Sequence, residues 1–110
     1  QDELMDRFGD MPRSVDNLLE IALIKAAAHQ AYVTELSGNR QEVRLKMYEK
    51  APFHVEKIPE LVDRYKGALK FTAAEQPYFT FADRKREIKE WGQMLERVKI
   101  LLNAIKELLV

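Results

Sequence analysis

The run I-K-E-W-G-Q-M-L-E-R-V-K-I-L-L-N-A-I-K-E-L-L, residues 88–109, decides the fold because it carries the longest periodic apolar pattern of the chain. Its apolar residues recur at alternating intervals of three and four, as they do on one face of a helix. We predict a long helix that begins at about Asp83. Neighbouring apolar residues widen this face beyond a narrow coiled-coil seam, which favours packing on a domain core. The row consists of Ile88, Trp91, Leu95, Val98, Leu102, Ile105 and Leu109, and Met94, Leu101 and Leu108 lie beside it.

Two pairs of segments upstream show the alternation of β-strands. Residues 32–36 and 43–47 flank the turn-forming run Ser37-Gly38-Asn39, which predicts a hairpin with one apolar face. Residues 69–73 and 78–81 flank a second turn and predict a second antiparallel pair. On the first hairpin we expect the apolar face to comprise Tyr32, Thr34, Leu36, Val43, Leu45 and Met47.

Three further helices are predicted. A short one covers residues 3–8 and ends at Gly9, and a long alanine-rich one runs from about Pro12 to His29 with Ser14 near its start. A third, short helix is expected around Pro59 after a loop, with Ile58, Leu61, Val62 and Tyr65 on one face and Gly67 as its stop. In the long helix, the residues at helical spacing are Val15, Leu18, Leu19, Ala22, Leu23 and Ala26.

The predicted fold class is therefore α+β. We expect a small antiparallel sheet of about four strands in two hairpins, covered by helices in the order ααββαββα and closed by the long C-terminal helix. Residues 1–9 are expected to be the end of a linking helix, and residues 10–110 a single domain. The chain opens on Gln1 inside this expected helix, so we expect a fragment of a longer polypeptide.

Composition excludes several function classes. Lysine and arginine together number 18, as do aspartate and glutamate, so no overall field favours nucleic acid or a membrane. The first 20 residues nevertheless hold six acids and two bases, which makes this end locally acidic. There is no cysteine, which excludes disulfides and thiolate metal sites and fits a cytoplasmic address. No apolar stretch is long enough to span a membrane.

Residues capable of catalysis are sparse and scattered. His29 and His54 are the two histidines, and their spacing does not match a metal site. Ser14 and Ser37 are best explained by a helix start and a turn, outside any nucleophile motif. The four glycines form no phosphate-binding loop. The sequence therefore predicts no catalytic, cofactor-binding or metal site.

The opening E-L-M-D-R-F-G-D-M-P-R-S-V, the alanine-rich helix after it, and I-P-E-L-V-D-R-Y before Leu69 resemble the C-terminal domain of bacterial transcription-repair coupling factor. The resemblance covers almost all 110 residues in order, and its most specific part is D-R-F-G-x-x-P at Asp6 to Pro12. One departure is visible. The family often has a glycine between the first long helix and the first strand, where this chain has Ala31 and Tyr32.

This resemblance implies a non-catalytic, autoinhibitory domain of an ATP-dependent DNA translocase that displaces stalled RNA polymerase and recruits nucleotide excision repair of damaged DNA. The domain is expected to dock on an N-terminal module of the same polypeptide that is similar to UvrB, and so to mask the binding of UvrA. Glu3, Asp6 and Arg7 match the family's charged residues at this contact. ATP and magnesium are expected only in the motor domains, and DNA is expected to be bound by other domains.

Two alternatives remain open at the level of sequence. The apolar row of the C-terminal helix also fits a free-standing oligomerisation module built on a coiled coil. Arg84, Lys85 and Arg86, close to Tyr78, Phe79 and Phe81, also fit a small nucleic-acid binder with salt-dependent affinity.

Overall fold

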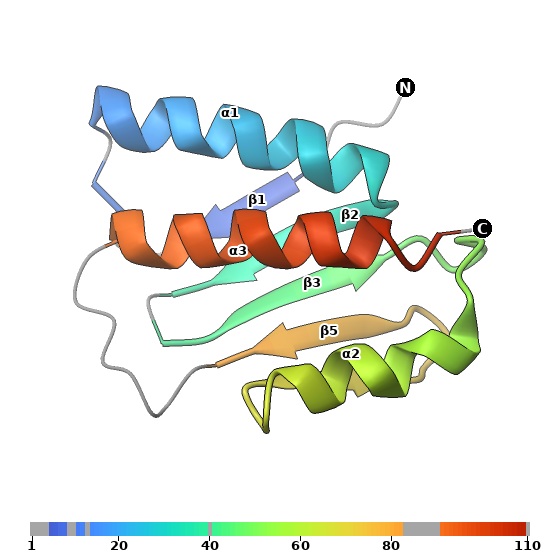
Figure 1. Ribbon diagram of the computed structural model, residues 1–110. Coiled ribbons are helices and arrows are strands. Elements are labelled where there is room, and N and C mark those ends of the chain that lie inside the picture. The colour runs from blue at the N-terminus through green and yellow to red at the C-terminus, as the bar shows by residue number, and fades with distance from the viewer. Residues whose placement is uncertain (1–4, 9–10, 13, 40, 83–90, 110) are drawn as a thin grey trace.

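The computed structural model describes residues 5–8, 11–12, 14–39, 41–82 and 91–109. These residues form one sheet covered by helices (Figure 1). The elements are β1 (Met5–Phe8), α1 (Val15–Gln30), β2 (Val33–Gly38), β3 (Val43–Met47), the 3₁₀ helix η1 (Val55–Lys57), α2 (Ile58–Arg64), β4 (Leu69–Thr72), β5 (Tyr78–Phe81) and α3 (Trp91–Lys106).

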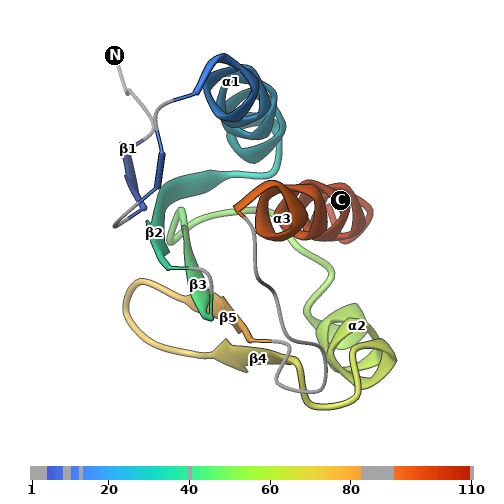
Figure 2. The ribbon, with the colours of Figure 1, turned by 90° about the vertical axis from the view of Figure 1, so that its left-hand side faces the viewer.

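The sheet has five strands in the order β1-β2-β3-β5-β4. The hairpins β2–β3 and β4–β5 are antiparallel, as predicted, and join through an antiparallel pairing of β3 with β5. All three α-helices lie on one face of the sheet (Figure 2). The predicted α+β class, the four antiparallel strands and the final helix are therefore confirmed.

The first element differs from its prediction. Met5–Phe8 form a strand parallel to β2, so the helix expected over residues 3–8 is wrong at these positions. A four-residue segment has too little periodicity to separate helix from strand, and pairing with β2 settles the conformation. Because α1 connects two parallel neighbours, β1, α1 and β2 form a βαβ unit. Glu3 and Leu4 lie outside the described residues.

The face by which α1 packs also differs from its prediction. Ile21, Ile24 and Ala28 are buried against the sheet and α3. The residues expected to form the packing face are exposed instead. The helix is apolar on almost every side, so its spacing alone does not identify the buried one. The exposed set is Val15, Leu18, Leu19, Ala22, Leu23 and Ala26.

The apolar row of α3 lies in the core. Trp91, Leu95, Val98, Leu102 and Ile105 are all buried, as are their neighbours Met94, Leu101 and Leu108. These side chains cannot reach a second helix unless the domain opens, so in the described part of α3 the coiled-coil alternative has no available surface. Ile88, Asp83 and the basic cluster at residues 84–86 lie outside the described residues.

Local chemistry explains several boundaries. The Ser14 hydroxyl accepts a hydrogen bond from the Asn17 N–H at 3.2 Å and caps the start of α1, as predicted. Between β2 and β3, the Asn39 side-chain oxygen accepts from the N–H groups of Gln41 and Glu42 at 2.8 and 3.0 Å. Gly67, with φ of 92°, follows α2 as predicted.

The first hairpin carries a register shift that the alternation did not predict. Val33 pairs with Met47 and Glu35 with Lys46, so β2 has a bulge between Val33 and Glu35. As a result Val33 and Leu36 are both buried, and Thr34 is not. The predicted face of β3 is confirmed, since its first, third and fifth residues are buried.

The passage from α1 to β2 runs through a strained residue. Tyr32 has φ of 64°, in the left-handed region that favours glycine. Its N–H donates to the His29 carbonyl at 3.2 Å, and its carbonyl accepts from the Tyr48 N–H at 2.7 Å. Hydrogen bonds on both sides of Tyr32 therefore hold this left-handed turn between α1 and β2.

We expect Tyr32→Val to lower the free energy of unfolding by about 1–2 kcal/mol, because a β-branched residue is poorly accommodated at positive φ. Tyr32→Gly is expected to change it by less than about 1 kcal/mol, since relief of strain offsets the greater flexibility of the unfolded chain. Both variants remove the ring, so urea denaturation of the pair isolates the backbone effect. Equal destabilisation by the two variants would contradict the left-handed conformation.

Candidate functional site

The segment that matches the family motif lies at one edge of the sheet. β1 pairs on one side with β2, through Met5 with Glu35, Asp6 with Leu36, Arg7 with Ser37 and Phe8 with Gly38. Its other side pairs with no strand among the described residues. Figure 2 shows β1 at the end of the sheet, below and beside α1. The backbone at Asp6 and Arg7 therefore runs along an outer edge of the domain.

Phe8 packs the edge strand β1 against the helical layer. Its ring is half-buried and meets the ring of Trp91 edge-on, with 5.6 Å between centroids and an interplanar angle of 67°. Such aromatic pairs contribute about 0.5–1.5 kcal/mol beyond the area they bury. Met11, a little further along the chain, also packs against the core. Packing contacts therefore hold the motif in place both in its strand, through Phe8, and near its end, through Met11.

The three predicted contact residues are placed only in part. Asp6 and Arg7 are consecutive residues of β1, so they do not form the polar face of a helix as expected from the sequence. Glu3 lies outside the described residues. The contact between Phe8 and Trp91 was not predicted, because the two residues are far apart in the sequence.

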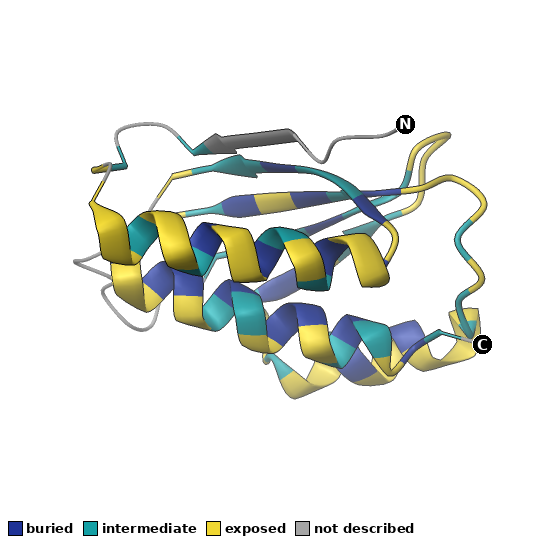
Figure 3. Ribbon diagram, turned by 90° about the horizontal axis from the view of Figure 1, so that it is seen from above, coloured by how far each residue is buried: buried dark blue, intermediate teal, exposed yellow. Residues whose placement is uncertain are grey.

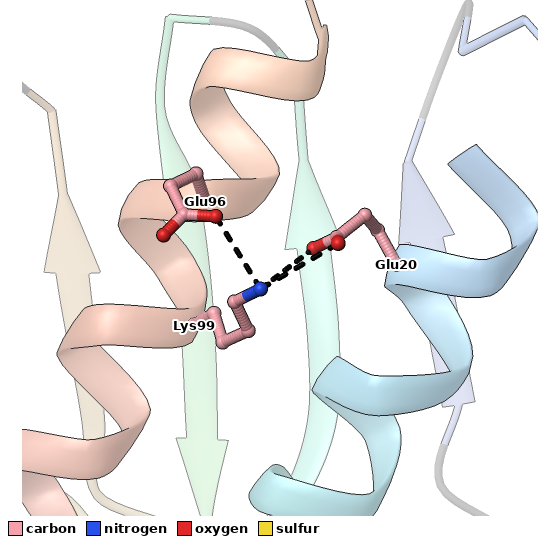
Figure 4. Close-up of polar contacts among 3 residues, drawn as sticks. All are labelled: Glu20, Glu96 and Lys99. Atoms are coloured by element: carbon pink, nitrogen blue, oxygen red, sulfur yellow. Dashed lines mark hydrogen bonds and ion pairs between the residues drawn. The ribbon is translucent and has the colours of Figure 1, made fainter. Parts of the chain in front are cut away.

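An ion-pair group joins α1 to α3 beside the core. The Lys99 ammonium donates to the Glu20 carboxylate at 3.1 Å and lies 3.3 Å from the Glu96 carboxylate (Figure 4). The hydrogen bond to Glu20, followed by that to Glu96, raises the pKa of Lys99 above its usual value. All three side chains retain contact with water, so the group aligns the two helices more than it stabilises them.

The sheet face away from the helices is polar. Arg44 lies over the Tyr78 ring, with its guanidinium carbon 4.6 Å from the centroid, and Lys46 lies 3.9 Å from the Glu35 carboxylate. Arg44, Lys46 and Tyr78 come from the adjacent strands β3 and β5. These contacts pair charged and aromatic side chains of neighbouring strands with one another.

The titratable groups within the described ranges do not assemble into a catalytic centre. His54 lies 3.2 Å from the exposed Glu56 carboxylate, whose pKa is lowered by a backbone hydrogen bond and, to a lesser extent, by His54. His29 is exposed near the end of α1. Across the described ranges no polar or charged side chain is buried, and no group of three or more acidic or histidine residues is placed to hold a metal ion. In the same ranges no helix has the length and apolarity needed to cross a bilayer.

Comparison with known proteins matches the segment that contains this edge. The sequence model of the TRCF domain matches residues 1–58, which is more than half of the chain. The chain belongs to the TRCF domain family. It is also similar to the transcription-repair-coupling factor of Bacillus subtilis (strain 168), with 36% identity over 67 residues. That match covers 59% of this chain and 6% of the relative.

Membership confirms the resemblance drawn from Asp6 to Pro12. The matched range of the TRCF domain includes β1, α1 and the first hairpin, and it ends as α2 begins. These are the elements that build the βαβ unit and the edge at Asp6 and Arg7.

Proposed function

We propose that this TRCF domain is a non-catalytic interaction domain of a transcription-repair coupling factor. It docks on a UvrB-like N-terminal module of the same polypeptide and masks the surface that binds UvrA. The observation that carries the proposal is the D-R-F-G-x-x-P motif at Asp6 to Pro12, which lies inside the segment matched by the family. Its strand occupies an edge of the sheet.

The site suits a reversible contact. An edge strand anchored by Phe8 and Trp91 offers a fixed backbone on which Asp6 and Arg7 can meet a partner without ordering a loop. Charged groups at such a contact provide specificity and faster association more than affinity. Docking and release then depend on the difference in free energy between the closed and open forms, for which about 1–3 kcal/mol is typical.

In this proposal the chemistry takes place elsewhere in the polypeptide. ATP and magnesium bind to motor domains, DNA is bound by other domains, and RNA polymerase and UvrA are affected only through the docking equilibrium. We also propose a cytoplasmic location, because that is where a transcription-repair coupling factor is expected to act. The absence of buried charged groups among the described residues supports a binding role over catalysis, since catalytic groups usually depend on such an environment.

We expect Glu3→Ala with Asp6→Ala to increase UvrA binding by a full-length coupling factor carrying this domain about tenfold, which corresponds to a lost coupling of about 1.4 kcal/mol. The basal ATPase should rise as well, because the closed form is less populated. Titration calorimetry with UvrA and a steady-state ATPase assay measure the two effects.

A matched control removes two exposed acids far from β1 in the sequence, Glu49 and Glu107, by the same substitutions. This control changes the net charge by the same amount. Its UvrA binding and ATPase activity should equal those of the unmodified protein. Unaltered UvrA binding and ATPase in the Glu3 and Asp6 variant, with the domain folded, would refute the docking role of these residues.

A further inference from the structure

The outward surface of α1 is apolar over three turns. Val15, Leu18, Leu19 and Leu23 are 72%, 44%, 60% and 55% exposed, and Figure 3 shows exposed positions along the length of this helix. Ala22 and Ala26 lie among them and are also exposed. We call these six residues the α1 strip.

Such a surface requires an explanation because a helix normally presents charged and polar residues to water. The charged residues of α1 lie outside the strip. Glu20 is engaged by Lys99 of α3, and Lys25, which is half-buried, has an interaction of its own. The strip amounts to roughly 500 Å² of apolar surface, a size at which patches on monomers mark interaction sites.

The spacing of the strip makes it complementary to itself. Its members at 15, 18, 19, 22, 23 and 26 are distributed symmetrically about the midpoint between Glu20 and Ile21. If a second α1 lies antiparallel across a two-fold axis at this level, Val15 faces Ala26 of the partner subunit and Leu18 faces Leu23 of the partner subunit. Leu19 then faces Ala22 of the partner subunit, so that two of the three contacts place a large side chain against a small one.

We propose that the α1 strip is a contact between two copies of this chain, with their α1 helices packed antiparallel about a two-fold axis. An uncharged strip fits an uncharged partner surface. In a two-fold symmetric dimer, the same strip of the second copy is that surface. The two alanines allow close approach of the helices. The contact goes beyond the docking function proposed above and involves neither Asp6 nor Arg7.

The area sets the expected strength. Two strips bury about 1,000 Å² together, at the lower limit for a specific interface and below the standard of about 1,600 Å². We therefore expect a weak dimer with a dissociation constant on the order of 100 µM, largely monomeric at about 1 µM.

Sedimentation equilibrium of this chain between about 1 and 500 µM tests the association. The wild-type chain should shift from monomer to dimer across this range, and Leu19→Glu should stay monomeric at every concentration because the contact would bury a carboxylate. Ile100→Glu is the matched control, since Ile100 is 54% exposed on α3 and lies outside the strip. It should dimerise as the wild type does. Circular dichroism verifies that each variant is folded.

The register is tested by charge pairing within one chain. In the antiparallel arrangement, the double variant Leu19→Glu with Ala22→Lys places each glutamate against a lysine of the other copy and should recover dimerisation that Leu19→Glu alone loses. In a parallel arrangement like charges would meet, and no recovery would follow.

Cross-linking provides an independent measurement because the chain has no cysteine. Chains carrying Val15→Cys and Ala26→Cys should form a mixed disulfide when combined under oxidation, and neither should link to itself efficiently, because identical positions are far apart in this register. A chain that remains monomeric up to 500 µM, a dimer that survives Leu19→Glu, or preferential self-linking at position 15 would each overturn the proposal.

Discussion

Leu102→Ala is expected to lower the free energy of unfolding by about 2–5 kcal/mol, the range for truncating a fully buried leucine. Leu102 lies in the C-terminal half of α3 with no exposed surface, among side chains that pack α3 against the rest of the core. The cavity left by the substitution can close only if the surrounding core residues or the helix itself shift. A domain of this size has about 5–15 kcal/mol of stability in total, so the variant should lose a large part of it.

Ile100→Ala is the matched control for this experiment. It removes an aliphatic side chain from the same helix, but Ile100 is 54% exposed, and we expect a change within about 0.5 kcal/mol. Urea denaturation followed by circular dichroism measures both variants. Similar destabilisation by the two would mean that the inward and outward faces of α3 are assigned wrongly.

Gly38→Ala is expected to have the second large effect, about 2–4 kcal/mol of destabilisation. Gly38 ends β2 with φ of 142°, a conformation that residues with a side chain rarely adopt. A methyl group there would collide with the carbonyl oxygen of Glu42 and lie 2.8 Å from the Cα of Val43, both of them backbone atoms that cannot turn away. Because Gly38 also pairs with Phe8, the strain reaches β1.

Gly92→Ala provides the contrast. A methyl group at Gly92 meets no atom within 4 Å, and alanine is the better helix former, so the variant should be stabilised by up to about 1 kcal/mol. Thermal unfolding distinguishes the two variants, because Tm should fall for Gly38→Ala and rise for Gly92→Ala. Amide hydrogen exchange should show faster exchange in β1, β2 and β3 for Gly38→Ala, and unchanged protection in these strands for Gly38→Ala would contradict the close approach at Glu42.

The elements that sequence predicted well are those whose information is local or strongly periodic. The wide apolar row of α3 indicated core packing, and the members of this row from Trp91 to Ile105 are indeed buried. Ser14, Asn39 and Gly67 act as cap, turn and helix stop through hydrogen bonds or backbone angles within a few residues. Local chemistry of this kind does not depend on the remainder of the fold.

The candidate site was only partly predictable. The motif at Asp6 to Pro12 identified the family, and the comparisons confirmed it. The conformation of the motif was not predictable, because Met5–Phe8 become a strand through pairing with residues 35–38, which follow α1 in the chain. The roles of Glu3, Asp6 and Arg7 stay predictions for the docking experiment.

By itself the sequence determined the family, the α+β class, the two hairpins and the amphipathic final helix, since caps, turns and periodicity act over short distances. Tertiary structure alone decided that β1 is a strand and that Ile21, Ile24 and Ala28 are the buried side of α1. A free edge on β2 and the position of α3 select between conformations and faces that are nearly equal in local free energy. The same selection leaves the α1 strip facing outward.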